Sequence, residues 1–120
     1  MDERKVMEKL ADIESFIGKS LPVVYKKFLS EEVSDNEVYQ MENNQGDFVY
    51  IYSYHDVIER NKTYEIQRVE PDYFLIGQDG DIGYFICLHN DSDKIYSLDL
   101  GALGSLDMDE EAKDIYSLRA

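Results

Sequence analysis

Cysteine, proline and tryptophan are scarce in this sequence: Cys87 is the only cysteine, proline occurs twice, and tryptophan is absent from 120 residues. A single thiol cannot form an internal disulfide, so the fold depends on its hydrophobic core, as is usual in a reducing compartment. No apolar run approaches the roughly 20 residues that cross a bilayer. The charged opening, MDERKVMEKL, lacks the apolar stretch of a secretory signal. We therefore expect a cytoplasmic protein.

Positive charge is also scarce, because 12 lysines and arginines stand against 26 aspartates and glutamates, a net charge of −14. Residues 1–29 carry a net charge of +1, which leaves −15 for the remainder. Such a surface repels phosphate backbones and anionic membranes, so we expect no direct binding to nucleic acid or to a membrane. It attracts a basic partner, although a negative surface can also serve only to keep a protein in solution.

The first third of the chain predicts two helices. Val6, Leu10, Ile13 and Ile17 recur at helical spacing, and Gly18 follows them where a helix would end. A second short helix is expected after Pro22, a residue that suits a first helical turn. The polar segment SEEVSDNE then predicts a loop.

The remainder predicts strands joined by tight turns. Five segments have strand character: EVYQM, DFVYIYSY, DYFLIG, DIGYFICL and KIYSLDL. At least two of Tyr50, Tyr52 and Tyr54, which share one face of the second strand, should be buried. Helices are expected over YHDVIERN and over the C-terminal segment DMDEEAKDIYSLRA. Short connections require antiparallel neighbours, so residues 1–120 predict one α+β domain with a meander sheet flanked by N-terminal, inserted and C-terminal helices.

Asp79 and Asp81, in LIGQDGDIGYFI, are the most suggestive candidates for a chemical site. If Asp79 began a calcium-binding loop, the sixth residue should be glycine, but it is Tyr84. Asp-Gly between two apolar segments is instead a strong hairpin signal, with Gly80 adopting a positive φ. We therefore predict a turn here.

No other residue pattern indicates catalysis or metal binding. His55 and Glu59 could share a helix face, but without a second histidine nearby an exposed surface histidine is the simpler interpretation. Cys87 lies within an apolar strand pattern that lacks basic neighbours, which predicts burial. No phosphate-binding loop, nucleophile elbow or Cys/His cluster is present. We expect a protein that is not an enzyme and uses no cofactor or metal.

The segment IESFIGKSLPVVYKKFL resembles the opening of the SUKH superfamily, in which a helix ends at glycine, Leu-Pro follows, and a second helix carries Tyr and Phe-Leu. YFLIGQDGDIGYFI resembles the central hairpin of that superfamily, and KIYSLDLGALG resembles its later strand and turn. The resemblance extends over residues 10–104. It implies an α+β fold and a bacterial immunity protein that neutralises a toxin, commonly a nuclease. Because a fungal branch of the superfamily regulates cell-wall synthesis, the resemblance also allows a regulatory adaptor of that type. A small-ligand-binding domain is a further alternative.

Charge and resemblance together predict that a basic nuclease toxin binds an acidic, loop-borne surface, because a nuclease is cationic where it holds nucleic acid. The candidate partner-binding residues are Glu31, Glu32, Asp35, Glu37, Glu42, Asp47, Asp91 and Asp93.

Overall fold

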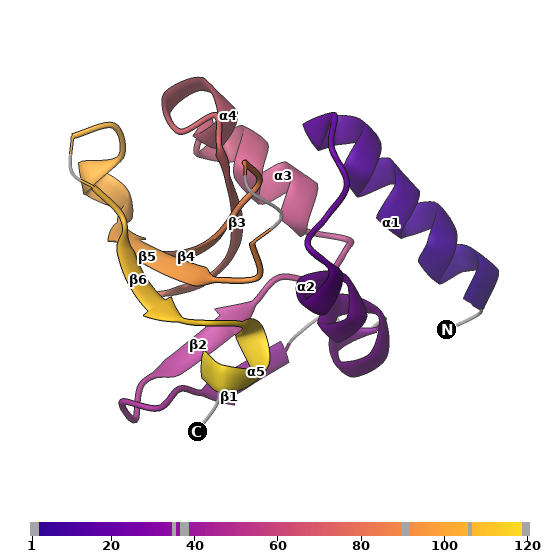
Figure 1. Ribbon diagram of the computed structural model, residues 1–120, viewed down its shortest axis with the longest axis horizontal. Helices are drawn as coiled ribbons and strands as arrows, with labels where there is room; N and C mark the ends of the chain where they lie inside the picture. Colours follow the sequence, from indigo (N-terminus) through magenta and orange to yellow (C-terminus); the bar gives the residue numbers. More distant parts are fainter. Residues whose placement is uncertain (1–2, 35, 37–38, 90–91, 106, 119–120) are drawn as a thin grey trace.

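A six-stranded antiparallel sheet forms the centre of the computed structural model, which describes residues 3–34, 36, 39–89, 92–105 and 107–118 (Figure 1). The strands pair strictly in chain order, which confirms the predicted meander. They are β1 (Tyr39–Glu42), β2 (Phe48–Ile51), β3 (Tyr73–Asp79), β4 (Ile82–Cys87), β5 (Ile95–Asp99) and β6 (Asp109–Ala112).

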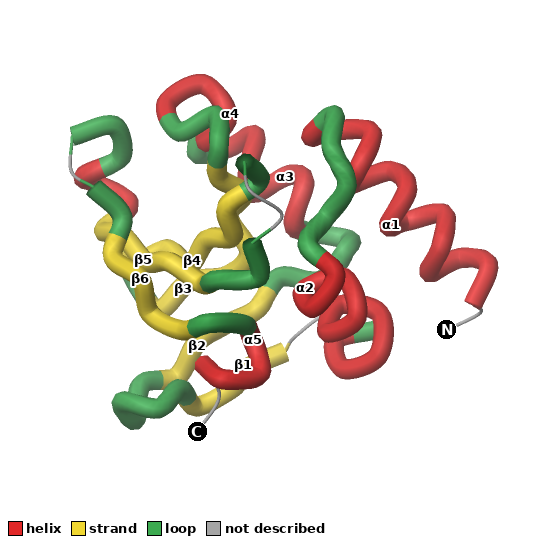
Figure 2. Tube along the Cα trace, in the orientation of Figure 1, coloured by secondary structure: helices red, strands yellow, loops and turns green. Residues whose placement is uncertain are grey.

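Helices before, within and after the sheet complete the predicted α+β fold (Figure 2). They are α1 (Glu3–Ile17), α2 (Val23–Phe28) with its continuation η1 (Leu29–Val33), α3 (Val57–Thr63), α4 (Ile66–Val69), η2 (Leu100–Ala102) and α5 (Ile115–Leu118). No helix in the described ranges is long and apolar enough to span a bilayer.

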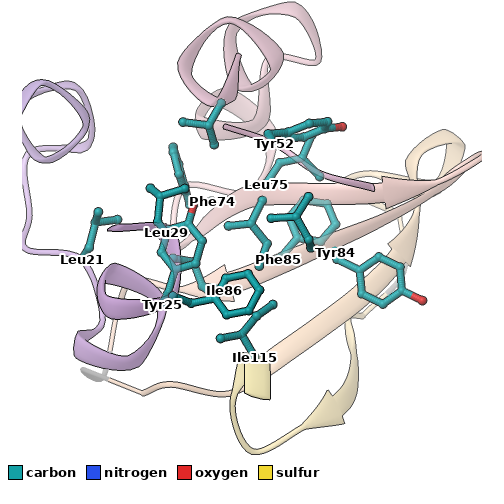
Figure 3. Close-up of a cluster of buried hydrophobic side chains, with 14 of the residues drawn as sticks. Leu21, Tyr25, Leu29, Tyr52, Phe74, Leu75, Tyr84, Phe85, Ile86 and Ile115 are labelled. Carbon is teal, nitrogen blue, oxygen red and sulfur yellow. The ribbon is translucent and has the colours of Figure 1, made fainter. Parts of the chain in front are cut away.

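One face of the sheet packs against α2, η1 and α5. Phe74 and Ile86 are paired across β3 and β4, and Tyr25, Leu29 and Ile115 gather around them (Figure 3). All five side chains are 0–1% exposed, so they belong to the centre of the core. The first two helices, α1 and α2, are thus held in place by burial of their apolar side chains, as the residue spacing predicts.

Helices α3 and α4 lie beside β3, whose first residues do not pair with β2. Asn61 of α3 is fully buried, and its Oδ1 accepts the N–H of Leu75 at 2.9 Å while its Nδ2 donates to the Leu75 carbonyl at 2.9 Å. The β3–β4 ladder has a bulge between Leu75 and Gly77. The Asn61 side chain therefore pairs with the backbone where the strand ladder is irregular.

The Asp79–Asp81 segment is the predicted turn. Asp79 and Ile82 are strand partners, which leaves Gly80 and Asp81 as a two-residue connection. Gly80 has φ 56°, the positive value that a type II′ turn requires at its first central position. Within the described ranges, no three His, Cys, Asp or Glu side chains are grouped where they could hold a metal ion.

Two local predictions are wrong. Asp109–Ala112, expected in the C-terminal helix, form β6, because Ala112 pairs with Ile95 and the free edge of β5 accepts another strand. Contacts to β5 reinforce this pairing, since Glu110 Oε1 lies 3.1 Å from Lys94 Nζ. Tertiary pairing here overrides the weak strand propensity of Asp-Glu-Glu-Ala.

Residues 30–33, expected in a loop, continue α2 as the wide-turned helix η1. The N–H of Ser34 donates to the carbonyl of Leu29, five residues earlier, at 2.8 Å. Leu29 and Val33 are both fully buried, so packing of these two side chains explains why the polar segment stays helical.

Other local predictions are confirmed. Val6, Leu10 and Ile13 are buried along α1, and the N–H of Gly18 donates to the Glu14 carbonyl at the helix end. Tyr52 and Tyr54 are buried whereas Tyr50 is half-buried. Cys87 is a buried free thiol, and His55 is exposed.

Candidate partner-binding surface

The tip of the β1–β2 hairpin is held by one buried side chain, Asn43. Its Oδ1 accepts the backbone N–H groups of Gln45 at 3.0 Å and Asp47 at 2.9 Å, and its Nδ2 donates to Tyr84 Oη at 3.3 Å. The next residue, Asn44, donates its N–H to the Leu118 carbonyl of α5 at 2.9 Å. The hairpin is therefore an ordered projection fixed to both the sheet and the C-terminal helix.

The outer side of this hairpin combines carboxylate and aromatic groups. Glu42 pairs with Phe48 across the strands and Gln40 pairs with Tyr50, so these four side chains share one face. Phe48 is 57% exposed, and Asp47 beside it is also exposed. We call this the hairpin face, composed of Gln40, Glu42, Phe48 and Tyr50, with Asp47 in the turn at its edge. The hairpin therefore presents an exposed aromatic ring beside carboxylates, a combination that suits contact with a basic and partly apolar surface.

A hollow of about 340 Å³ opens beside the hairpin face. It is lined by Gln40, Phe48, Tyr50, Tyr52, Arg60, Gln78, Asp79 and Gly80. The Tyr50 and Tyr52 rings meet edge to face at 5.8 Å, and the Arg60 guanidinium carbon lies 5.9 Å from the Tyr52 ring centre. The hollow therefore lies between β2, the β3–β4 turn and Arg60 of α3, and aromatic and polar side chains both line it.

The Tyr52 hydroxyl in this hollow donates a hydrogen bond to Gln78 Oε1. Burial is the main cause that raises the pKa of Tyr52 above its usual range, and the neighbouring Tyr64 raises it further. The phenol therefore stays protonated and acts as a hydrogen-bond donor at physiological pH. Aromatic faces with nearby carboxylate and amide oxygens suit contacts with basic and amphipathic side chains.

The predicted partner-binding residues do not form a single patch. Glu42 lies on the hairpin face with Asp47 at its edge, whereas Glu31 and Glu32 are exposed on η1. Asp93 is half-buried, and its Oδ1 accepts the N–H of Val24 at 3.0 Å, so it stabilises the start of α2. Asp35, Glu37 and Asp91 lie outside the described residues.

None of the residues that line the hollow was among the sequence-based partner-binding candidates. Phe48 lies next to Asp47 in the chain and opposite Glu42, and Arg60 reaches the hollow from α3. Strand alternation placed Phe48 on the same face as Tyr50, but it could not show that Phe48 is exposed whereas Tyr52 is buried.

The fold and this surface define a small α+β domain with an acidic and aromatic projection. The model of the SMI1/KNR4 family (SUKH-1) matches residues 7–117, and the chain therefore belongs to this family. This confirms the resemblance that the opening helices and central hairpin suggested. SUKH domains are in general protein-interaction modules. A comparison with curated proteins found no significant match.

Proposed function

We propose that this protein is a cytoplasmic immunity protein that binds a basic toxin of the nuclease type and has no catalytic activity itself. The observation that carries the proposal is the hairpin face, where Phe48, 57% exposed, lies beside Asp47 and across from Glu42. Membership of a family of interaction modules supports the same conclusion.

The two components of this face suit different parts of the binding process. A net charge of −14 attracts a cationic protein and accelerates encounter. An aromatic side chain that becomes desolvated in the complex supplies an anchor, the usual centre of a binding interface. The cationic groove that holds nucleic acid in a nuclease would then be blocked by the hairpin rather than by RNA or DNA.

The first experiment captures the toxin from the native host and measures its affinity for the purified immunity protein by calorimetry. Raising the salt concentration from about 50 to about 300 mM should weaken binding at least tenfold, because screening removes the attraction between exposed charges. The immunity protein alone should leave RNA and DNA intact, and adding it should stop cleavage by the toxin. Binding that is indifferent to salt, or nucleolytic activity of the immunity protein itself, would contradict the proposal.

Charge-reversal variants locate the binding surface. E42K combined with D47K should weaken toxin binding at least about tenfold, since both changes place a cation beside Phe48. D12K combined with D107K, two exposed positions outside the hairpin face, is the matched control with the same change in net charge, and it should weaken binding less than about threefold. Equal effects of the two would indicate that only net charge matters and that the hairpin face is not the contact site.

The hollow supports a second candidate function, binding of a small ligand between the sheet and α3. Its volume of about 340 Å³ is at the lower end of the range for small-molecule sites. A thermal-shift screen with nucleotides and divalent metals tests this alternative. A compound that raises the melting temperature of the wild type, but not of Y50A, would favour it over protein binding.

A further inference from the structure

A second concave site, separate from the hairpin face, lies between the first two helices. We call it the α1–α2 groove, and its volume is about 530 Å³. It is lined by Val6, Met7, Leu10, Val23, Lys26, Lys27, Ser30, Glu31 and Ser34. In Figure 1, α1 lies at the opposite side of the molecule from the tip of the β1–β2 hairpin. A partner in this groove would therefore leave the hairpin tip free.

Apolar side chains form both the floor and the edges of the groove. Val6 and Leu10 are 9% and 3% exposed and belong to the core, whereas Met7 is 58% and Val23 78% exposed. Exposure of two large apolar side chains over an apolar floor is the pattern of a contact surface. The unbranched side chain of Met7 can adapt to an incoming group.

Charge in the groove differs from that of the chain as a whole. Its lining contains two lysines and one glutamate, in a protein with a net charge of −14. Lys26 Nζ lies 3.4 Å from Glu14 Oε2, so its charge is partly compensated, and Lys27 is exposed. The α2 side of the groove therefore presents the exposed Lys27 ammonium beside the Lys26–Glu14 ion pair, and Lys27 favours an occupant with a carboxylate at that position.

The walls of the groove restrict the shape of its occupant. Val6, Met7 and Leu10 come from α1, and Val23, Lys26 and Lys27 come from α2. Both walls are helical, and the N–H of Val24 at the start of α2 donates to Asp93 Oδ1, so they offer no strand edge to an incoming segment. Only side chains are available, which is the situation in which an amphipathic helix inserts apolar residues at i, i+3, i+4 and i+7.

We propose that the α1–α2 groove binds an amphipathic helix of a second protein, whose apolar residues contact Met7 and Val23 and whose carboxylates lie beside Lys26 and Lys27. This partner has the opposite charge preference from the toxin. One molecule can thus hold both partners at the same time.

The test uses a displayed library of helical 16-residue peptides, selected on the wild type and counter-selected on V23E. Selected peptides should combine apolar residues at helical spacing with flanking Asp or Glu. In fluorescence anisotropy, K27E should weaken their binding at least about fivefold, and replacing the flanking acids by lysine should restore binding to K27E. K9E, on an exposed position of α1 outside the groove lining, is the matched control and should change binding less than about twofold.

Several outcomes would overturn the proposal: no enriched sequence, enrichment without acids, or K9E and K27E having equal effects. A dimer of the protein alone that dissociates in V23E would also overturn it, because a second copy would then cover the groove. Met7, Val23 and Lys27 are exposed, so these variants should keep the wild-type circular dichroism spectrum and melting temperature. Toxin binding by K27E should be unchanged, and loss of peptide binding is thereby distinguished from failure of the proposed immunity function.

Discussion

Two buried tyrosines allow a matched test of how the core is packed. The Tyr25 ring is 1% exposed, and its hydroxyl has no hydrogen-bond partner within the described residues. The Tyr84 ring is 4% exposed, but its hydroxyl accepts a hydrogen bond from Asn43 Nδ2 at 3.3 Å. The same chemical change, tyrosine to phenylalanine, should therefore have opposite effects at the two positions.

In Y25F, removal of the unpaired buried hydroxyl eliminates its desolvation cost of about 1–3 kcal/mol. The variant also loses the packing contacts of the hydroxyl oxygen, so the net gain in stability is smaller than this cost. We expect the free energy of unfolding to rise by about 1 kcal/mol, equivalent to a melting temperature about 4 °C higher for a domain of this size. For Y84F, the loss of one neutral hydrogen bond should lower stability by about 1 kcal/mol.

The assay is urea unfolding followed by circular dichroism, with melting measured by calorimetry. An unchanged m-value in both variants would show that stability has changed, and not the extent of unfolding. The reasoning would be refuted if Y25F destabilised the protein as much as Y84F does, because the Tyr25 hydroxyl would then have a partner or an essential packing role.

Two further predictions concern the backbone and alkaline pH. In G77A the new Cβ would lie 2.5 Å from the Tyr50 carbonyl oxygen, whereas in G80A the new Cβ meets no atom within 4 Å but the alanine must adopt φ 56°. We expect urea unfolding to show a loss of stability of about 3 kcal/mol for G77A and about 1 kcal/mol for G80A. The reversed order would contradict the close approach of β2 and β3 at Gly77. Burial raises the pKa of Tyr25 above the unfolded value of 10.0, so the unfolded state releases its proton first and stability falls as pH rises above about 10. Y25F should lose less stability than the wild type between pH 9 and about 11 in the same assay, and parallel curves would show that Tyr25 does not contribute.

The fold was largely predictable because its signals are local. The apolar stripe Val6–Leu10–Ile13 and the turn at Gly80 each specify their conformation within a few residues. Short connections between strands then leave a meander as the simplest topology. β6 could not be predicted in this way, since Asp109–Ala112 become a strand only through pairing with β5. Such non-local pairing overrides local propensity and leaves no signal in a single sequence.

The binding surface was only partly predictable, for a related reason. Acidic residues close in sequence, such as Glu31 and Glu42, fall on separate elements, and Asp93 stabilises the start of α2. On the tyrosine-rich face, exposure falls from 57% at Phe48 to 1% at Tyr52. Alternation identifies the face, but tertiary packing around Tyr52 and Tyr54 decides which part of it remains available to a partner.

Because the hairpin is already ordered before binding, its charged and aromatic side chains should affect different rate constants: the carboxylates the association rate, and Phe48 the dissociation rate. Asn43 fixes the turn before any partner arrives, so binding requires little further ordering of the backbone. Exposed carboxylates act mainly on diffusional encounter, and neutralising Glu42 or Asp47 should therefore lower the association rate and its salt dependence. Phe48 makes its contact only after docking, so its removal should mainly raise the dissociation rate. Kinetics thus separate the attraction that brings a basic partner to this face from the contact that retains it.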